Sequence, residues 1–457
     1  MNRVTRRAGI LLIFLLILAA GIGFFVWEFF QDSGDWVTFS GSPHIYQNSS
    51  TGTGTVTDRD GVLLLDTRGD REYSGDTMIR KSTLHWLGDR QGNISTRVMS
   101  GFVKEMAGFD YLNGLYNYAD SAGEAELTLS TRIQTAALQA LDGRKGTVAV
   151  YNYRTGEILC AVTAPTFDPD NVPDITGDES GAYEGAYVNR FLHSAYIPGS
   201  IFKVVTTAAA LETVEGVEEM TFTCKGVYEY GVDRVTCEKS HGTLDLKGAL
   251  ANSCNCCFAQ IAQLIGAENM TACVEKYGVT APMTLDGLTS VSGNYDVTKA
   301  AAVELAWSCI GQYTDQINPC RYMTFMGMIA GEGVAAQPYL VESIRVGEEE
   351  TYRAETVQLD RIMDQETARV LQTYLRNNVE SIYGDWNFPG MTVCAKSGTS
   401  QLGGGKTSNA MFAGFVADEE YPLAFIVVVE NGGYGSTACV PVLSKVLAEC
   451  KAVLDGQ

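Results

Sequence analysis

The chain has 457 residues, of which 46% are hydrophobic and 19% are charged, so it can bury a large core and form two or three domains. Its formal net charge is -21, with only 33 lysines and arginines. Nucleic-acid binding needs clustered basic side chains that neutralise phosphates, and the sequence has no such cluster. The composition therefore predicts a globular, enzyme-sized protein that does not bind nucleic acid.

An apolar segment without a charged residue runs from Ala8 to Trp27, and three arginines precede it (Arg3, Arg6 and Arg7). Its length is close to the ~20 residues that a membrane-spanning helix needs. A cleaved signal peptide is the alternative, but its apolar region normally ends after ~7 to 15 residues. We therefore expect an uncleaved single-pass anchor, with the chain after Glu28 outside the cytoplasm by the positive-inside rule.

Local patterns divide the remainder of the chain. A polar linker around residues 49–52 precedes residues 53–66, where two β-prone runs around an Asp-Gly turn predict a hairpin. After residue 127 the pattern becomes regular, with a helix over 130–142 and two strands over 145–164. Near the C-terminus we expect strands over 409–417 and 422–430 and a final helix from about Ala438.

These elements predict three parts and an α+β fold. Residues 1–30 would be the cytoplasmic tail and transmembrane anchor, and residues 31–126 a small β-rich module outside the cytoplasm. Residues 127–457 would form a large domain in which helices flank an antiparallel sheet.

A serine and a lysine stand three positions apart at Ser200 and Lys203, directly after Pro198 and Gly199. The apolar run that follows predicts a helix, with Ser200 at or near its N-terminus and Lys203 one turn later on the same face. A lysine that is buried near another positive charge can act as the base for a serine nucleophile. The alternative is a serine that caps the helix and a lysine on the surface.

A second motif, Ser253-Cys254-Asn255, interrupts residues 241–266, which otherwise read as helix, break and helix. Its hydroxyl and amide groups are suited to relaying a proton and holding a substrate amide. A competing Ser-x-Asn pattern at Ser292 and Asn294 lies in a glycine-rich turn, and we interpret it as a plain turn.

A third motif, Lys396-Ser397-Gly398-Thr399, lies on an expected strand. Lys396 offers a fixed positive charge, Gly398 would let a substrate backbone approach, and Thr399 can bind a carboxylate. Residues 400–407 also resemble a phosphate-binding loop, but Ser400 replaces its first glycine and a strand is expected where that loop needs a helix. We therefore do not expect nucleotide binding.

In this order the three motifs resemble the set shared by penicillin-binding proteins and serine β-lactamases. The framework YIPGSIFK, HGTLDLKGALANSCN and AKSGT resembles the transpeptidase domain of class B penicillin-binding proteins from about Leu127 to the end. The segments TVTDRDGVLLLD and IRKSTLHWLGD resemble the N-terminal module of penicillin-binding protein A-like members, a pedestal or dimerisation-like module.

The resemblance implies a peptidoglycan D,D-transpeptidase that cross-links stem peptides through an acyl-enzyme and is acylated by β-lactams. Ser200 would be the nucleophile, Lys203 its base, and Ser253 the proton relay. The other residues that it implies at the site are Asn255, Lys396, Ser397, Gly398 and Thr399. A D,D-carboxypeptidase is an open alternative, while a β-lactamase and a non-catalytic β-lactam-binding scaffold fit less well.

The same resemblance implies no cofactor and no metal. The four histidines have no pair at ligand spacing: His44, His85, His193 and His241. The expected partner is a membrane-embedded glycan polymerase of the shape, elongation, division or sporulation family, docked on the anchor and residues 31–126.

Twelve cysteines are many for an exported domain, and most lie in apolar surroundings. Cys224 and Cys237 flank an expected two-stranded ribbon whose ends could approach each other. A disulfide between them is one hypothesis, and two free thiols are the other.

Overall fold

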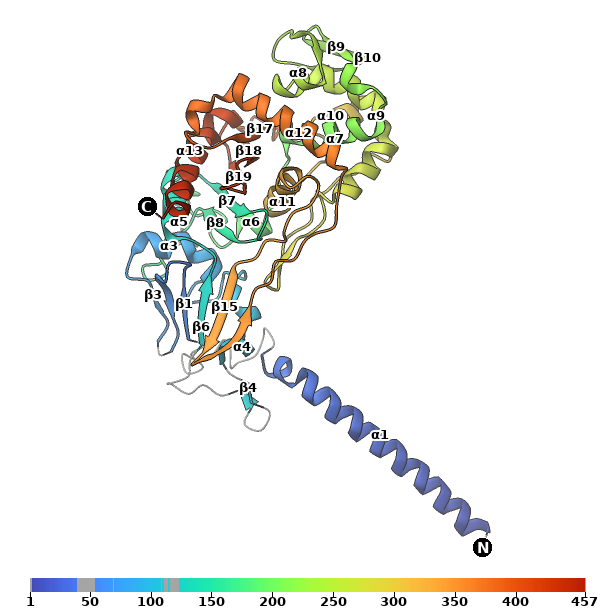
Figure 1. The fold of residues 1–457 in the computed structure, drawn as a ribbon, viewed down its shortest axis with the longest axis vertical. Helices are drawn as coiled ribbons and strands as arrows, with labels where there is room; N and C mark the ends of the chain where they lie inside the picture. The colour runs from blue at the N-terminus through green and yellow to red at the C-terminus, as the bar shows by residue number, and fades with distance from the viewer. Residues whose placement is uncertain are drawn as a thin grey trace.

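The computed structural model describes residues 2–38, 54–68, 70–107, 109–110, 114–115 and 123–456. The linker expected around residues 49–52 lies outside them. Helix α1 (Asn2–Thr38) projects away from the folded body in Figure 1. Its segment Arg3–Ser33 is long and apolar enough to cross a membrane, and none of its most apolar window is buried against the rest of the protein. The helix therefore has the properties of a single-pass membrane anchor.

A five-stranded antiparallel sheet forms the centre of the large domain, in the order β17-β18-β19-β7-β8. The strands are β7 (Gly146–Asn152), β8 (Ile158–Ala164), β17 (Val393–Ser400), β18 (Asn409–Val416) and β19 (Leu423–Val429). All the strands predicted over 145–164 and 409–430 are thus confirmed. Both β18 and β19 are buried along their whole length, because helices cover both faces of the sheet.

Two helices pack together on one face of this sheet, α5 (Thr131–Leu141) and α13 (Gly435–Leu454). Helix α5 turns Ile133, Ala137 and Leu141 towards the sheet at helical spacing. Helix α11 (Pro319–Ala330) packs against β18 and β19 from the other face. The α+β arrangement expected from the sequence is confirmed (Figure 1).

A second, mixed sheet has the order β16-β15-β6-β1-β2-β3. Its strands are β1 (Gly54–Thr57), β2 (Leu63–Asp66), β3 (Glu72–Tyr73), β6 (Gly123–Leu127), β15 (Val341–Val346) and β16 (Glu349–Arg353). The antiparallel pair β1–β2 confirms the hairpin predicted from the sequence. Strand β6 contains the boundary expected at residue 127 and pairs with β1 and β15, so this sheet joins both sides of that boundary.

A lobe of helices and short strands stands above the five-stranded sheet in Figure 1, at the end of the molecule opposite α1. Its helices are α7 (Lys203–Thr213), α8 (Leu246–Ala251), α9 (Asn255–Tyr277), α10 (Ala302–Ser308) and α12 (Gln365–Asn378). Its strands are β9 (Thr221–Cys224), β10 (Val227–Tyr230), β11 (Asp233–Thr236) and β12 (Gly242–Asp245). The expected ribbon is the antiparallel pair β10–β11, but Cys224 and Cys237 beside it are free thiols rather than a disulfide.

Further helices and strands lie outside these groups. They are α3 (Thr77–Leu87), α4 (Val103–Ala107), α6 (Arg190–His193), β4 (Phe109–Asp110), β5 (Gly114–Leu115), β13 (Thr284–Leu285) and β14 (Leu288–Thr289).

Candidate active site

The turn that carries Ser200 is held from two sides. Ser200 lies in the 3-10 turn η2 (Gly199–Phe202), which runs directly into α7. Gly199 has a φ of 56°, a conformation that favours glycine, and its N–H donates to the carbonyl oxygen of Gly311 at 2.8 Å. A Cβ at position 199 would stand 2.5 Å from the carbonyl oxygen of Thr399. Only glycine therefore allows this turn to pack so closely against β17, the edge strand of the sheet.

Lys203 begins α7 and is fully buried, so the alternative of a surface lysine is wrong. Its Nζ lies 3.2 Å from the Oγ atoms of both Ser200 and Ser253. It also donates to the carbonyl oxygen of Ser253 at 2.6 Å and to Oδ1 of Asn255 at 2.7 Å. The ring of Phe258 lies below this ammonium, with its centre 5.5 Å from Nζ. These contacts fix the amine beside the Ser200 hydroxyl.

The break between α8 and α9 positions the second motif. Helix α8 ends at Ala251 and α9 begins at Asn255, as the sequence predicted. Ser253 adopts a φ of 51°, which is uncommon outside glycine and recurs at functional sites. Asn255 donates one amide hydrogen to the carbonyl oxygen of Thr236 at 2.9 Å. An asparagine amide has two hydrogens, so the second remains available to an acceptor in the site.

Strand β17 brings the third motif to the same place. The Nζ atom of Lys396 lies 3.2 Å from Ser253 Oγ and donates to the carbonyl oxygen of Ser397 at 2.8 Å. Lys396 is fully buried, like Lys203. The hydroxyl of Ser253 thus lies between the two lysine side chains.

Burial changes the acid–base behaviour of both lysines. It lowers the pKa of Lys203 to about 7, and the positive charge of Lys396 is the second cause. Burial also lowers the pKa of Lys396 to about 7. A neutral amine at Lys203 is therefore accessible near neutral pH, and such an amine can take the proton of the Ser200 hydroxyl. The arrangement can activate a serine for nucleophilic attack on a carbonyl group.

The outer edge of β17 faces the turn of Ser200. The backbone N–H of Ser397 donates to the hydroxyl of Tyr383 at 2.9 Å, so it points away from β18. Backbone groups of alternate residues point the same way along a strand, and the N–H of Thr399 therefore faces the same edge. Backbone donors from both the turn and the strand are thus available to a negatively charged oxygen between them.

Gly398 has a packing role in addition to the substrate approach expected from the sequence, which stays a prediction. A Cβ at this position would stand 2.7 Å from the carbonyl oxygen of Pro198 and 3.2 Å from the backbone nitrogen of Ile201. A Cβ at Gly435 would collide with the carbonyl oxygen of Gly398. The missing Cβ of Gly398 therefore lets the turn of Ser200 approach β17, and the missing Cβ of Gly435 lets the start of α13 approach the same strand.

Sequence reasoning missed several residues that shape this site. Tyr383, whose hydroxyl also lies 2.9 Å from Ser397 Oγ, comes from a helical turn before β17 and carries no local motif. Gly435 donates its N–H to Thr399 Oγ1 at 3.1 Å across the start of α13. Phe258 could have been found from the helical period, because it follows Asn255 at a spacing of one turn.

The two competing motifs do not join the cluster. Asn294 pairs with Gln316 through its backbone and donates its side-chain amide to the carbonyl oxygen of Thr314, which confirms a structural turn. Strand β18 follows Lys406 and Thr407, whereas a phosphate-binding loop would lead into a helix.

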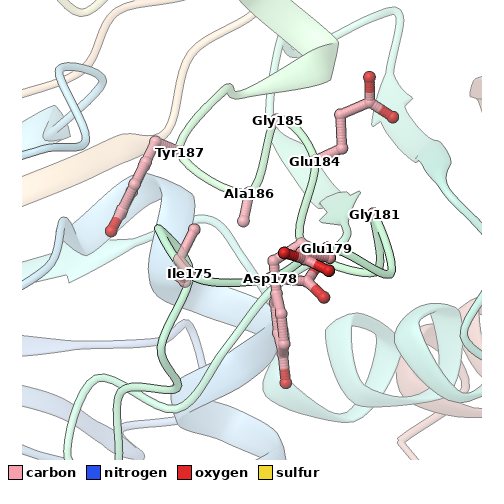
Figure 2. A pocket seen from close by; sticks show the side chains of 9 residues that line it. Ile175, Asp178, Glu179, Gly181, Glu184, Gly185, Ala186 and Tyr187 are labelled. Carbon is pink, nitrogen blue, oxygen red and sulfur yellow. The ribbon is translucent and has the colours of Figure 1, made fainter.

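A pocket of about 370 Å³ lies in the long loop between β8 and α6 (Figure 2). Its lining residues are Ile175, Asp178, Glu179, Gly181, Tyr183, Glu184, Gly185, Ala186 and Tyr187. Figure 2 shows several of their carboxylates, and none of the three motifs contributes to the lining. The cluster formed by the three motifs is therefore separate from this pocket.

Several known proteins are similar to this chain in sequence and fold. Residues 146–448 match the family described as penicillin binding protein transpeptidase domain. Peptidoglycan D,D-transpeptidase PbpA of Mycolicibacterium smegmatis is 27% identical over 338 residues, which are 68% of this chain and 68% of that protein. The D,D-transpeptidase domain of a peptidoglycan glycosyltransferase from Eggerthella lenta superimposes with a TM-score of 0.73 at 27% identity, covering 88% of this chain and 98% of that one. The imipenem acyl-enzyme of penicillin-binding protein A from M. tuberculosis, at 22% identity, superimposes with a TM-score of 0.75 over 88% of this chain and 99% of that one.

Proposed function

Because this chain belongs to the penicillin-binding protein transpeptidase family, we propose that it is a peptidoglycan D,D-transpeptidase that works through an acyl-enzyme on Ser200. The observation that carries the proposal is the position of Lys203, whose buried amine contacts the hydroxyls of both Ser200 and Ser253. A base that contacts the nucleophile and a second hydroxyl can serve both proton transfers of an acyl transfer.

In the first half-reaction, Ser200 Oγ attacks the carbonyl carbon between the two terminal D-alanines of a stem peptide, and Lys203 takes the hydroxyl proton. The C–N bond then breaks, Ser253 passes a proton to the leaving amine, and the last D-alanine departs. Lys396 orients Ser253 and keeps the pKa of Lys203 low. The backbone N–H groups of Ser200 and Thr399 stabilise the oxyanion, which typically contributes ~3 to 4 kcal/mol per donor.

In the second half-reaction, an amine from another stem peptide attacks the ester carbon. It loses a proton to the same base, Ser200 regains its hydroxyl, and a peptide cross-link remains. The free amide hydrogen of Asn255 holds the donor peptide, and Ser397 and Thr399 bind its terminal carboxylate, beside Gly398. A β-lactam would enter the first half-reaction in place of the D-Ala-D-Ala terminus.

By the positive-inside rule, an anchor preceded by Arg3, Arg6 and Arg7 would put this chemistry outside the cytoplasm. The three-part division at residues 30 and 126 belongs to the same proposal. A membrane-embedded glycan polymerase would dock on α1 and on the module built around β1, β2 and β3. Deleting the module should abolish co-purification with such a polymerase, and undiminished co-purification would contradict the docking.

The test is intact-protein mass spectrometry of the full-length protein in detergent after incubation with penicillin G. Wild type should gain one adduct that maps to Ser200, and Ser200→Ala should gain none. Ser292→Ala, in the competing motif, is the matched control and should be acylated like wild type. If no adduct forms and the penicillin remains unhydrolysed, the proposal is overturned in favour of a non-catalytic scaffold. If the protein rapidly hydrolyses penicillin, it is a β-lactamase.

A D,D-carboxypeptidase would give the same adduct, so the acceptor needs its own measurement. A stem-peptide substrate should yield cross-linked dimers when a second stem peptide is present. Hydrolysis that an added amine acceptor does not reduce would contradict the transpeptidase and support the carboxypeptidase.

A further inference from the structure

Three thiols and an imidazole converge beside the active site without taking part in the proposed acyl transfer. The ligating atoms of Cys224, Cys237, His241 and Cys254 all lie within 4.8 Å of one another. His241 Nδ1 is 3.6 Å from the Sγ atom of Cys224 and 3.4 Å from that of Cys237. The Sγ atoms of Cys237 and Cys254 are 3.9 Å apart.

Separate elements deliver these four side chains to one point. Cys224 ends β9, Cys237 follows β11, His241 precedes β12, and Cys254 is the N-cap of α9. The pairing of β9 with β12 brings Cys224 and His241 together. The backbone N–H of Cys237 donates to the carbonyl oxygen of Gly226 at 2.9 Å, which anchors the end of β11 beside them.

The spacing of the four atoms matches the size of a tetrahedral zinc site. Zinc bonds of ~2.3 Å to sulfur and ~2.0 Å to nitrogen give tetrahedral edges of about 3.8 Å between sulfurs and about 3.5 Å between sulfur and nitrogen. The observed separations of 3.9, 3.6 and 3.4 Å lie close to these edges. We propose that Cys224, Cys237, His241 and Cys254 bind one zinc ion.

The ligand set decides what the ion can do. Binding replaces the three thiol protons, which leave as H⁺, and His241 ligates through its neutral Nδ1. Four protein ligands complete a tetrahedral shell with no position for water or substrate. The zinc is therefore structural, and the acyl transfer proposed above needs no change. The sequence expectation of no metal considered only histidine pairs, whereas this site has one histidine and three cysteines spaced as C-x12-C-x3-H-x12-C, with only Cys237 and His241 close in sequence.

A disulfide accounts less well for the same cluster. Cys224 and Cys237 could be joined, but Cys254 and His241 would then remain beside the bond without a partner of matching chemistry. The Cys237–Cys254 separation of 3.9 Å also exceeds the ~2.05 Å of a disulfide. All four groups have a common role only around a shared ion.

The ion would fix the second catalytic motif in place. Cys254 stands between Ser253 and Asn255, both of which contact Lys203. On the other side of the cluster, the carbonyl oxygen of Thr236, next to Cys237, accepts from the Asn255 side chain. Zinc therefore ties the β9–β12 strands to the start of α9 and so positions Ser253 and Asn255. This consequence, unlike the metal site itself, rests on the proposed function.

Metal content of the full-length protein, purified in detergent under reducing conditions, tests the site directly. Inductively coupled plasma mass spectrometry should find one zinc ion per chain in wild type. Cys224→Ser, Cys254→Ser and His241→Ala should each lose most of it. Cys273→Ser and His193→Ala are matched controls outside the cluster and should retain it.

The absorption spectrum of bound Co²⁺ identifies the ligands in wild type, so the test does not depend on whether a serine variant folds. Wild-type protein stripped with a chelator and loaded with Co²⁺ should show the visible bands of a tetrahedral ion and a thiolate charge-transfer band. The proposal would be overturned if metal-free wild type failed to bind Co²⁺ and subsequent alkylation showed that all twelve thiols were free. It would also be overturned if peptide mapping showed a disulfide between Cys224 and Cys237. Equal zinc loss from Cys273→Ser would do the same, because it would indicate nonspecific thiol binding.

Penicillin acylation of the same samples separates this inference from the proposed function. Removal of zinc should slow acylation of Ser200 by about 10²-fold, and restored zinc should recover the rate. Stoichiometric zinc in a protein that is never acylated would sink the transpeptidase and leave the metal site intact. Rapid acylation of both zinc-loaded and zinc-free protein would keep the enzyme and reject the positioning role.

Discussion

The amines of Lys203 and Lys396 lie at the same distance, 3.2 Å, from a single atom, the hydroxyl oxygen of Ser253. Both side chains are fully buried, and two positive charges so close together disfavour each other. Ser253 can therefore exchange a proton with either amine, and the charge on one lysine influences the proton affinity of the other.

This relationship predicts how acylation depends on pH. The rate of penicillin adduct formation should rise with pH around 7, because Lys203 must be neutral to accept the Ser200 proton and its pKa is lowered to about 7. In Lys396→Met the positive charge that helps to lower this pKa is gone, so the midpoint should move to higher pH. Quenched-reaction mass spectrometry across a pH series measures the rate of adduct formation and so gives the midpoint. Lys451→Met on α13 is the control. An unchanged or lower midpoint would show that Lys396 does not act on Lys203 in this way.

The same burial predicts a pH-dependent stability. The pKa of Lys203 is about 7 in the folded protein and ~10.4 when unfolded, so the unfolded chain binds the extra proton between these values. The free energy of unfolding of wild type should therefore rise with pH across this window and lose that contribution as the pH falls towards 7. Lys203→Met should reduce the slope by about 1.4 kcal/mol per pH unit. Urea unfolding at several pH values measures the free energy of unfolding of both proteins. If this free energy changed equally with pH in wild type and Lys203→Met, a buried, neutral Lys203 would be contradicted.

Gly398 offers a test of the packing around the nucleophile. Gly398→Ala would bring a Cβ to 2.7 Å from the carbonyl oxygen of Pro198, so the turn of Ser200 must move. We expect a loss of stability of about 1–3 kcal/mol and acylation slower by about 10²-fold. Gly75→Ala is the control, because nothing lies within 4 Å of a Cβ there. Acylation of Gly398→Ala at the wild-type rate would mean that this contact does not position Ser200.

A charged network holds the chain segment that leads to Ser200. Arg190 Nε lies 2.7 Å from Glu430 Oε1, which also accepts from the hydroxyl of Tyr196 at 2.8 Å, shortly before Ser200. Glu430→Gln leaves the largely buried guanidinium without its counter-ion. The free energy of unfolding should fall by about 2–3 kcal/mol, less than for a completely buried pair because Glu430 is partly exposed.

The control for Glu430→Gln is Glu350→Gln, which removes an exposed ion pair with Arg353. Its effect on the free energy of unfolding should be much smaller than that of Glu430→Gln, since exposed pairs contribute little. Equal effects of the two substitutions on urea unfolding would contradict a special role for Glu430.

Features that depend on neighbours in sequence were predictable. The hairpin of β1 and β2, the break at Ser253 and the strand of Lys396 each follow from a local pattern, and the spacing of Ser200 and Lys203 defines one helical turn. What the sequence did not reveal depends on contacts between distant segments. Tyr383 reaches Ser397 only because η4 (Val379–Tyr383) folds back on β17, and Gly398 matters because the turn at Pro198 packs there.

The cysteines show the same limit. Local reasoning found that Cys224 and Cys237 flank a ribbon and left a disulfide and two free thiols as alternatives, but it could not place His241 or Cys254 beside them. Their meeting depends on the pairing of β9 with β12 and on the start of α9, which are tertiary features.

The sheet that contains β6 sets a limit on how the protein can be divided. A recombinant fragment that began at Leu127 would lose β1, β2, β3 and nearly all of β6, while it kept β15 and β16. The long edge of β15 would then be unpaired, and such an edge is a template for aggregation. A soluble catalytic fragment therefore has to begin upstream of Gly54, so the module next to the membrane must be expressed with the enzyme that it supports.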